Sequence, residues 1–233
     1  MKKILTLSSL LISLSIHGCF AGEDYFTQRY KHFTATNTNS LELKYLHRFD
    51  NSAGVLLTAY NNLGHHFDEL KSVGNEAEFW YPLYLADNKD FKIMGGGQLT
   101  MQPSGSFVCA NIGGFYNLFD ALTLGSRYRY VKFNHKTIDI NGEENYANFH
   151  QLDYYITYKI NNKWATEFNA TNNIFINNFH RANGRNDNWE IKQSVNYKIN
   201  DTWSVQSQIG WYERVQVEHK ENYLLSMAAS YKF

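Results

Sequence analysis

The chain has 233 residues, of which 16% are aromatic, and it contains 22 basic and 22 acidic side chains but only two prolines. This charge balance excludes a nucleic-acid-binding domain, which would be strongly basic. Beyond the first residues no long apolar run occurs, and this excludes a membrane-spanning helix.

Residues 1–21 have the pattern of a secretory signal peptide. Lys2 and Lys3 precede an apolar stretch, and Cys19 and Ala21 are small residues placed just before Gly22. The alternative is a lipoprotein signal in which Cys19 carries the lipid. Both predict export, and removal of Lys2 and Lys3 leaves 20 basic and 22 acidic side chains, a net charge of −2.

Cys109 is the one cysteine that follows the predicted signal peptide, so no intramolecular disulfide can form. An exported chain without disulfides must be stabilised by a core or by a membrane. Many aromatic and Asn residues, alternating polarity and modest hydropathy are typical of an outer-membrane β-barrel.

Short breaks and longer polar stretches alternate along the exported part of the chain. Two breaks are near copies, "YKINNKW" and "YKINDTW", and the breaks recur every 32 to 41 residues. The five short breaks are 48–54, 85–91, 117–122, 158–164 and 197–203. The six longer stretches are 34–39, 63–71, 103–105, 134–145, 177–188 and 216–222.

Five short turns and six longer loops delimit twelve antiparallel strands, with both chain ends on the short-turn side. Short periplasmic turns and longer external loops are the expected asymmetry of an outer-membrane barrel. Trp164 and Trp203 follow two of the short turns. We expect both rings to lie at the headgroup level of the periplasmic rim.

Parity along the strands assigns their two faces, because successive side chains of a strand point to opposite sides. The predicted lipid-facing sets are Leu41, Leu43, Tyr45, His47 and Phe49; Leu122, Leu124, Tyr128 and Tyr130; and Trp189, Ile191, Val195, Tyr197 and Ile199. The opposing sets are Glu42, Lys44, Leu46 and Arg48; Thr123, Arg127 and Arg129; and Glu190, Lys192, Ser194, Asn196 and Lys198. Apolar residues outside and charged residues inside predict a barrel around water, whereas a soluble sandwich would bury its apolar face.

The last strand, "ENYLLSMAASYKF", alternates to its final residue, Phe233. A closed barrel requires the last strand to pair with the first, so that no sheet edge remains.

Four segments follow one another along the chain: "NEAEFWYPLYLADNKDFKI" (75–93), "GSRYRYVKF" (125–133), "HQLDYYITYKIN" (150–161) and the "SYKF" ending (230–233). With these segments in this order, the chain resembles the oligogalacturonate-specific porin family, which includes sialic-acid-inducible channels. The resemblance covers essentially all of the exported chain. It implies a narrow, monomeric, twelve-stranded channel for acidic sugars with inward basic residues. It also implies that the C-terminal Phe233 belongs to the signal read by the barrel assembly machinery.

Carried over by this resemblance, Arg127 and Arg129 match an inward arginine pair. Lys44 matches an inward basic position on the second strand, and Arg214 matches an arginine near the end of the eleventh. The chain departs from the family at Gln151, where a relative has a basic residue, so its basic track is thinner. The full set of predicted lumen-lining, substrate-binding residues is Arg127, Arg129, Lys44, Arg48, Arg214, Lys192 and Arg29.

Arginine pairs bidentately with carboxylates and keeps its charge at any working pH. A ladder of such groups would let an anionic sugar move between several weak sites. Inward acids would neutralise parts of the wall, and inward aromatics could stack on sugar rings. The acids are Glu42, Glu76, Glu78, Asp153 and Glu190, and the aromatics are Trp80, Tyr155 and Tyr212.

The inward charges, the histidines and the possibility of enzyme activity each have an alternative interpretation. The inward charges could simply fill a small barrel, as they do in a narrow structural or adhesin-type barrel without transport. His65 and His66 lack metal-ligand spacing, since adjacent residues of an extended chain point apart. No His-x-Ser pair occurs, which argues against a barrel lipase, so no enzyme activity is expected.

The sequence therefore predicts an all-β protein in which residues 22–233 form a single twelve-stranded antiparallel transmembrane β-barrel in the bacterial outer membrane. Its expected partners are outer-membrane lipid, the barrel assembly machinery and acidic mono- or oligosaccharides. We expect a monomer that needs no metal or other cofactor.

Overall fold

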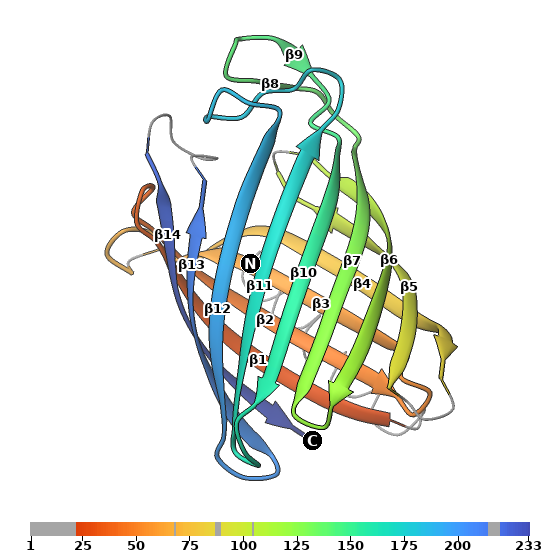
Figure 1. Cartoon of the computed structure of the whole chain (residues 1–233). Helices are drawn as coiled ribbons and strands as arrows, with labels where there is room; N and C mark the ends of the chain where they lie inside the picture. The colour runs from red at the N-terminus through yellow and green to blue at the C-terminus, as the bar shows by residue number, and fades with distance from the viewer. Residues whose placement is uncertain (1–21, 68, 87–89, 104, 214–219) are drawn as a thin grey trace.

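The computed structural model describes residues 22–233 except 68, 87–89, 104 and 214–219, so the predicted signal peptide lies outside the described residues. Twelve described strands form a closed antiparallel barrel, and β8 and β9 pair separately above its rim (Figure 1). No helix in the described ranges is long and apolar enough to cross a membrane. The strands are β1 (Gly22–Phe33), β2 (Thr38–Phe49), β3 (Gly54–Asn62), β4 (Lys71–Leu85), β5 (Phe91–Met101), β6 (Phe107–Phe119), β7 (Leu122–Phe133), β8 (Thr137–Ile138), β9 (Glu144–Asn145), β10 (Phe149–Lys159), β11 (Trp164–Phe175), β12 (Asp187–Lys198), β13 (Trp203–Tyr212) and β14 (Asn222–Lys232).

The near-copied breaks are tight turns of the same construction. Asn161 accepts hydrogen bonds at its Oδ1 from the backbone N–H groups of Lys163 at 2.9 Å and Trp164 at 3.0 Å. Asn200 does the same for Thr202 at 3.0 Å and Trp203 at 2.7 Å. An Asn side chain that bonds the backbone two residues on stabilises such a turn, which explains why Asn recurs there.

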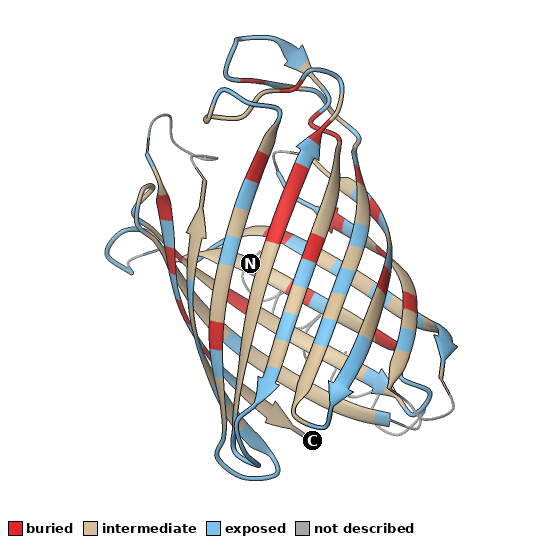
Figure 2. Cartoon of the chain, viewed as in Figure 1, coloured by how far each residue is buried: buried red, intermediate tan, exposed pale blue. Residues whose placement is uncertain are grey.

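The two faces of the barrel wall alternate as the parity of the sequence predicts. On β14, Tyr223, Leu225 and Met227 are exposed, whereas Leu224 between them is 1% exposed. Figure 2 shows the same alternation along the neighbouring strands. Large exposed apolar side chains on a closed wall of paired strands suit hydrocarbon, because the backbone groups of the strands bond to each other.

The closure of the barrel pairs its first strand with its last. β1 pairs with β14 along a register that runs from Tyr25 opposite Lys232 to Phe33 opposite Leu224. The backbone N–H of Phe233 donates to the carbonyl of Asp24 at 3.0 Å. The final alternating strand thereby covers the edge that β1 would otherwise expose.

Aromatic pairs mark the short-turn rim, as expected for a headgroup belt. The Trp164 ring lies 4.5 Å from that of Tyr197, and the Trp203 ring lies 4.9 Å from that of Tyr231. Both tryptophans are exposed at the start of their strands, β11 and β13.

At the opposite end, the long loops of residues 134–148 and 176–186 pack on each other. Ala147, Phe175 and Phe179 form a small buried cluster. Asp139 accepts backbone hydrogen bonds from Asn141 at 2.8 Å and Glu143 at 3.0 Å within its own loop. It also accepts one from His180 of the second loop at 3.2 Å. Burial opposes ionisation of Asp139, but the N–H donors outweigh it and hold the pKa of this carboxyl below its ordinary value.

Candidate functional site

Charged side chains of strands that do not pair with each other meet on the inner face of the wall. Glu78 of β4 lies within reach of Arg127 and Arg129 of β7, although β5 and β6 separate the two strands. Gly96 lies opposite Trp80 and Gly113 lies opposite Arg127, and neither carries a side chain. We call this inner side the lumen face.

Four residues form a central network, which we define as Glu78, Arg127, Arg129 and Asp153. The Arg127 Nη1 lies 3.2 Å from Glu78 Oε1, and its Nε lies 3.1 Å from Asp153 Oδ2. The Arg129 Nη2 lies 2.8 Å from the same Glu78 oxygen. Two arginines therefore face two carboxylates, and the central network has no net charge.

Neutral donors and acceptors complete the central network. Arg127 donates from Nη2 to the hydroxyl of Tyr155 at 2.7 Å, and its guanidinium lies 5.7 Å from the centre of that ring. The 3% exposed carboxylate of Asp153 accepts further hydrogen bonds from Gln151 and Thr171. Gln151 therefore supports an acid in this chain.

The remaining predicted site residues are spread around the lumen face. Lys44 lies 3.2 Å from Glu42, and Lys192 lies 2.9 Å from Glu190, with its ammonium 5.1 Å from the centre of the Tyr212 ring. Arg29 of β1 donates from Nη2 to Oε1 of Gln206 at 2.6 Å. The predicted residue Arg214 lies outside the described residues.

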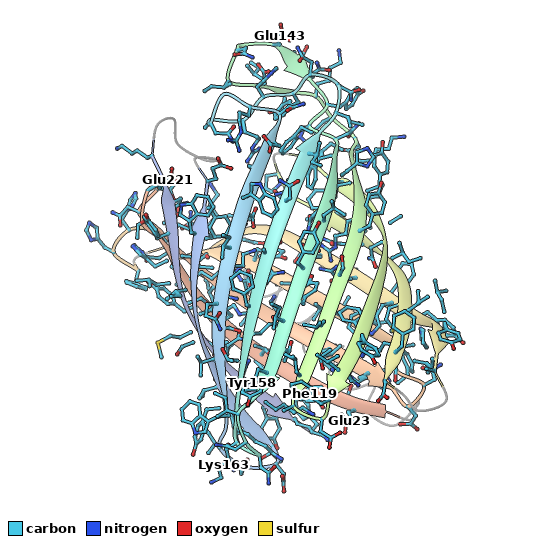
Figure 3. All side chains as sticks on the ribbon, viewed as in Figure 1. Glu23, Phe119, Glu143, Tyr158, Lys163 and Glu221 are labelled. Carbon is cyan, nitrogen blue, oxygen red and sulfur yellow. The ribbon has the colours of Figure 1, made fainter. Side chains whose placement is uncertain are left out.

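The sixth described residue of the predicted set, Arg48, lies at the short-turn end of the lumen in a cavity of about 440 Å³, the periplasmic cavity. Figure 3 places the labelled Glu23, Phe119 and Lys163 at this end, whereas Glu143 and Glu221 lie at the opposite end. The periplasmic cavity is lined by Arg48, Ser52, Leu56, Glu78, Trp80, Lys92, Met94, Asn111, Gly113, Phe115 and Arg127. Predicted residues from β2 and β7 thus meet at one cavity, together with the predicted aromatic Trp80.

Two glycines give the aromatic rings of the periplasmic cavity their positions. A Cβ on Gly54 would lie 2.3 Å from the Trp80 ring, and one on Gly125 would lie 2.5 Å from the Phe115 ring. Because neither glycine has a side chain, Trp80 lies over β3 and Phe115 lies over β7. The Trp80 indole N–H also donates to the Ser52 carbonyl at 3.2 Å.

Two lysines of the lumen face were missed in the sequence. Lys31 of β1 pairs with Glu42, and Lys92 of β5 lines the periplasmic cavity. The signal was available for both, because Lys31 is two residues from Arg29 and Lys92 alternates with apolar neighbours in "FKIM".

A second cavity, of about 530 Å³, lies toward the long loops. Its lining includes Lys31, Glu42, Tyr60 and Lys71. Tyr60 donates to Glu76 at 2.8 Å, and on β4 Glu76 is followed at the next inward position by Glu78 of the central network. The polar and charged groups of the lumen face therefore continue from one cavity to the other.

Comparisons with known proteins agree with this architecture. The sequence model of the oligogalacturonate-specific porin protein (KdgM) family matches residues 20–233. The structure of the NanC porin superposes with a TM-score of 0.79 at 17% identity, covering 89% of this chain and all of that one. The KdgM porin in complex with disordered oligogalacturonate gives 0.66 at 16% identity, covering 90% and 99%. The COG4313 outer-membrane channel from Pseudomonas putida F1 gives 0.64 at 12% identity, covering 91% and 96%.

Proposed function

Because the chain belongs to the oligogalacturonate-specific porin family, it is an outer-membrane channel, and we propose that small acidic saccharides diffuse through it along the basic residues of its lumen face. The observation that carries this proposal is the family match over residues 20–233 of a chain whose lumen face holds cations on several strands.

The paired state of most of these cations suits conduction. An arginine already bonded to Glu78 or Asp153 can exchange that partner for the carboxylate of a passing sugar, so the net gain on binding is small. Conduction requires sites that attract a solute and still release it. We therefore assign Arg127 and Arg129 the role of a selectivity element through which acidic sugars pass.

The family is one of porins, which favours a channel over a structural or adhesin-type barrel. The proposal extends to the partners of the chain. The barrel works as a monomer in outer-membrane lipid, and the assembly machinery reads its C-terminal strand. Oligogalacturonates and sialic acid are the candidate solutes, and no catalytic step is proposed.

The test is the ion preference of the purified channel in a planar bilayer under a salt gradient. Arg127→Ala with Arg129→Ala leaves Glu78 and Asp153 without their arginine partners, so the preference should move from anions toward cations. Lys132→Ala with Lys136→Ala is the control, because it removes two exposed cations away from the lumen face. An unchanged anion-to-cation ratio in the arginine variant would exclude the assigned role.

A further inference from the structure

We propose that the periplasmic cavity is a binding subsite for one acidic pyranose unit, whose carboxylate is held by Arg48 and Lys92 and whose ring lies on Trp80. This inference rests on the proposed function and deepens it, since it names where along the channel an acidic sugar is held. In this proposal the strongest contact with the sugar carboxylate is made by Arg48 and Lys92 and not by Arg127 and Arg129.

Arg48 and Lys92 differ in their partners from five other described cations of the lumen face, and Arg29, which bonds to Gln206, lies outside their cavity. Within the described part of the chain, neither has a carboxylate oxygen within 4.0 Å, whereas Arg127, Arg129, Lys31, Lys44 and Lys192 each have one. Because no carboxylate of the wall is bonded to them, their donors are open to a carboxylate of the solute.

The two cations line the same cavity, and their like charges repel each other there. Arg48 comes from β2 and Lys92 from β5, so the cavity brings together two like charges of separate strands. An anion placed between them would relieve this repulsion and bond to both. The shared carboxylate is therefore favoured by two interactions, while Glu78, which also lines the cavity, keeps a polyanion from binding too tightly.

Aromatic faces extend from the cations toward the central network. The Lys92 ammonium lies 5.4 Å from the centre of the Phe115 ring, which lies 6.1 Å from that of Tyr155. The Tyr155 ring in turn carries Arg127 on its face. The contact of its ammonium with the aromatic face holds Lys92 in position before a solute arrives, so less conformational freedom is lost when the solute binds.

The volume of the periplasmic cavity and the chemistry of its lining residues indicate which class of ligand it can bind. A volume of about 440 Å³ lies within the range of roughly 300–1,000 Å³ in which proteins bind small molecules. Trp80 offers a flat ring fixed over Gly54, against which the C–H face of a pyranose can pack. Asn111 and Ser52 supply polar groups for hydroxyls. The combination of two open cations, a flat apolar wall and polar groups fits a uronic or sialic acid better than a neutral sugar or an inorganic anion.

The experiment measures sugar-induced blocking of single-channel current in a planar bilayer, with galacturonate, sialic acid, galactose or sulfate added on the periplasmic side. In the unmodified channel the acidic sugars should block and galactose and sulfate should not. Arg48→Gln with Lys92→Gln should raise the half-blocking concentration of galacturonate on the order of tenfold, since it removes charge-assisted bonds. Trp80→Ala should raise it on the order of threefold, since it removes the aromatic wall on which the sugar ring lies.

The matched control is Lys159→Gln with Lys198→Gln, which removes the same charge from the periplasmic mouth but outside the cavity. It should leave the half-blocking concentration within about twofold of the unmodified value, because exposed charges contribute little to the free energy of an interaction. If the control weakens blocking as much as the cavity variant, or if neither the cavity variant nor Trp80→Ala weakens it, the subsite is refuted while the channel function stands. If the unmodified channel shows neither blocking nor anion preference, the proposed function fails as well. Retained unit conductance shows that each variant has folded.

Discussion

The central network makes the ion preference of the channel depend on two carboxylates as much as on two arginines. Glu78→Gln with Asp153→Asn keeps the shape of both side chains and removes two negative charges, so the central network changes from neutral to +2. At about 5 Å in water one unit charge changes the energy of a passing ion by ~0.8 kcal/mol. Two charges give ~1.6 kcal/mol, which screening at 0.1 M salt reduces to about 1 kcal/mol.

A change of about 1 kcal/mol raises the local anion concentration about fivefold and lowers that of cations by the same factor. The anion-to-cation permeability ratio should therefore rise by roughly 5- to 25-fold. The reversal potential of the purified channel under a potassium chloride gradient measures this ratio directly. Glu143→Gln with Glu144→Gln is the control, because it makes the same change in net charge within the exposed β8–β9 region.

An increase below about twofold in the Glu78 and Asp153 variant would refute this reasoning, because it would mean that permeating ions do not pass the central network at close range. The same would follow if the β8–β9 control shifted the ratio equally. Oligosaccharide blocking should strengthen in the variant, since Arg127 and Arg129 would then be free to bond the solute carboxylate.

Three further predictions follow from particular contacts. Gly125→Leu should displace the Phe115 ring, because even a Cβ would lie 2.5 Å from it, and single-channel recording should show a lower conductance. Asp139→Asn should expose the loop of residues 134–148 to proteolysis. In the unmodified chain the loop should be fully protected from proteolysis at pH 5 to 7, and the protection should fall only below about pH 3.9. A carboxylate whose pKa is lowered by folding stabilises the folded loop at any pH above the ordinary pKa of Asp, and this stabilisation is lost when the carboxylate is protonated. If the loop of residues 134–148 were still protected from proteolysis at pH 2, the role of Asp139 would be contradicted. Deletion of Phe233 removes its hydrogen bond to Asp24 and its ring contact with Tyr231, and immunoblots of outer-membrane fractions should show less folded barrel.

The architecture of this protein follows from local features of its amino-acid sequence. Alternation along each strand and Asn-centred breaks such as those at Asn161 and Asn200 are local features, because side-chain direction and turn geometry depend only on residues close in the chain. They were sufficient for twelve strands, for their two faces and for the position of Trp164 at the rim. The small β8–β9 pair was not predicted, because it depends on packing against the loop of residues 176–186.

Only the tertiary structure decided which charges meet across the lumen. Parity places Glu78, Arg127 and Lys92 on the inner face, but it does not say that Glu78 neutralises Arg127 while Lys92 keeps no carboxylate partner among the described residues. Those contacts depend on strand tilt and on the relative register of strands that do not pair with each other. These quantities are fixed only when the sheet closes, because closure links the strand number and the stagger of the register to the curvature of the wall.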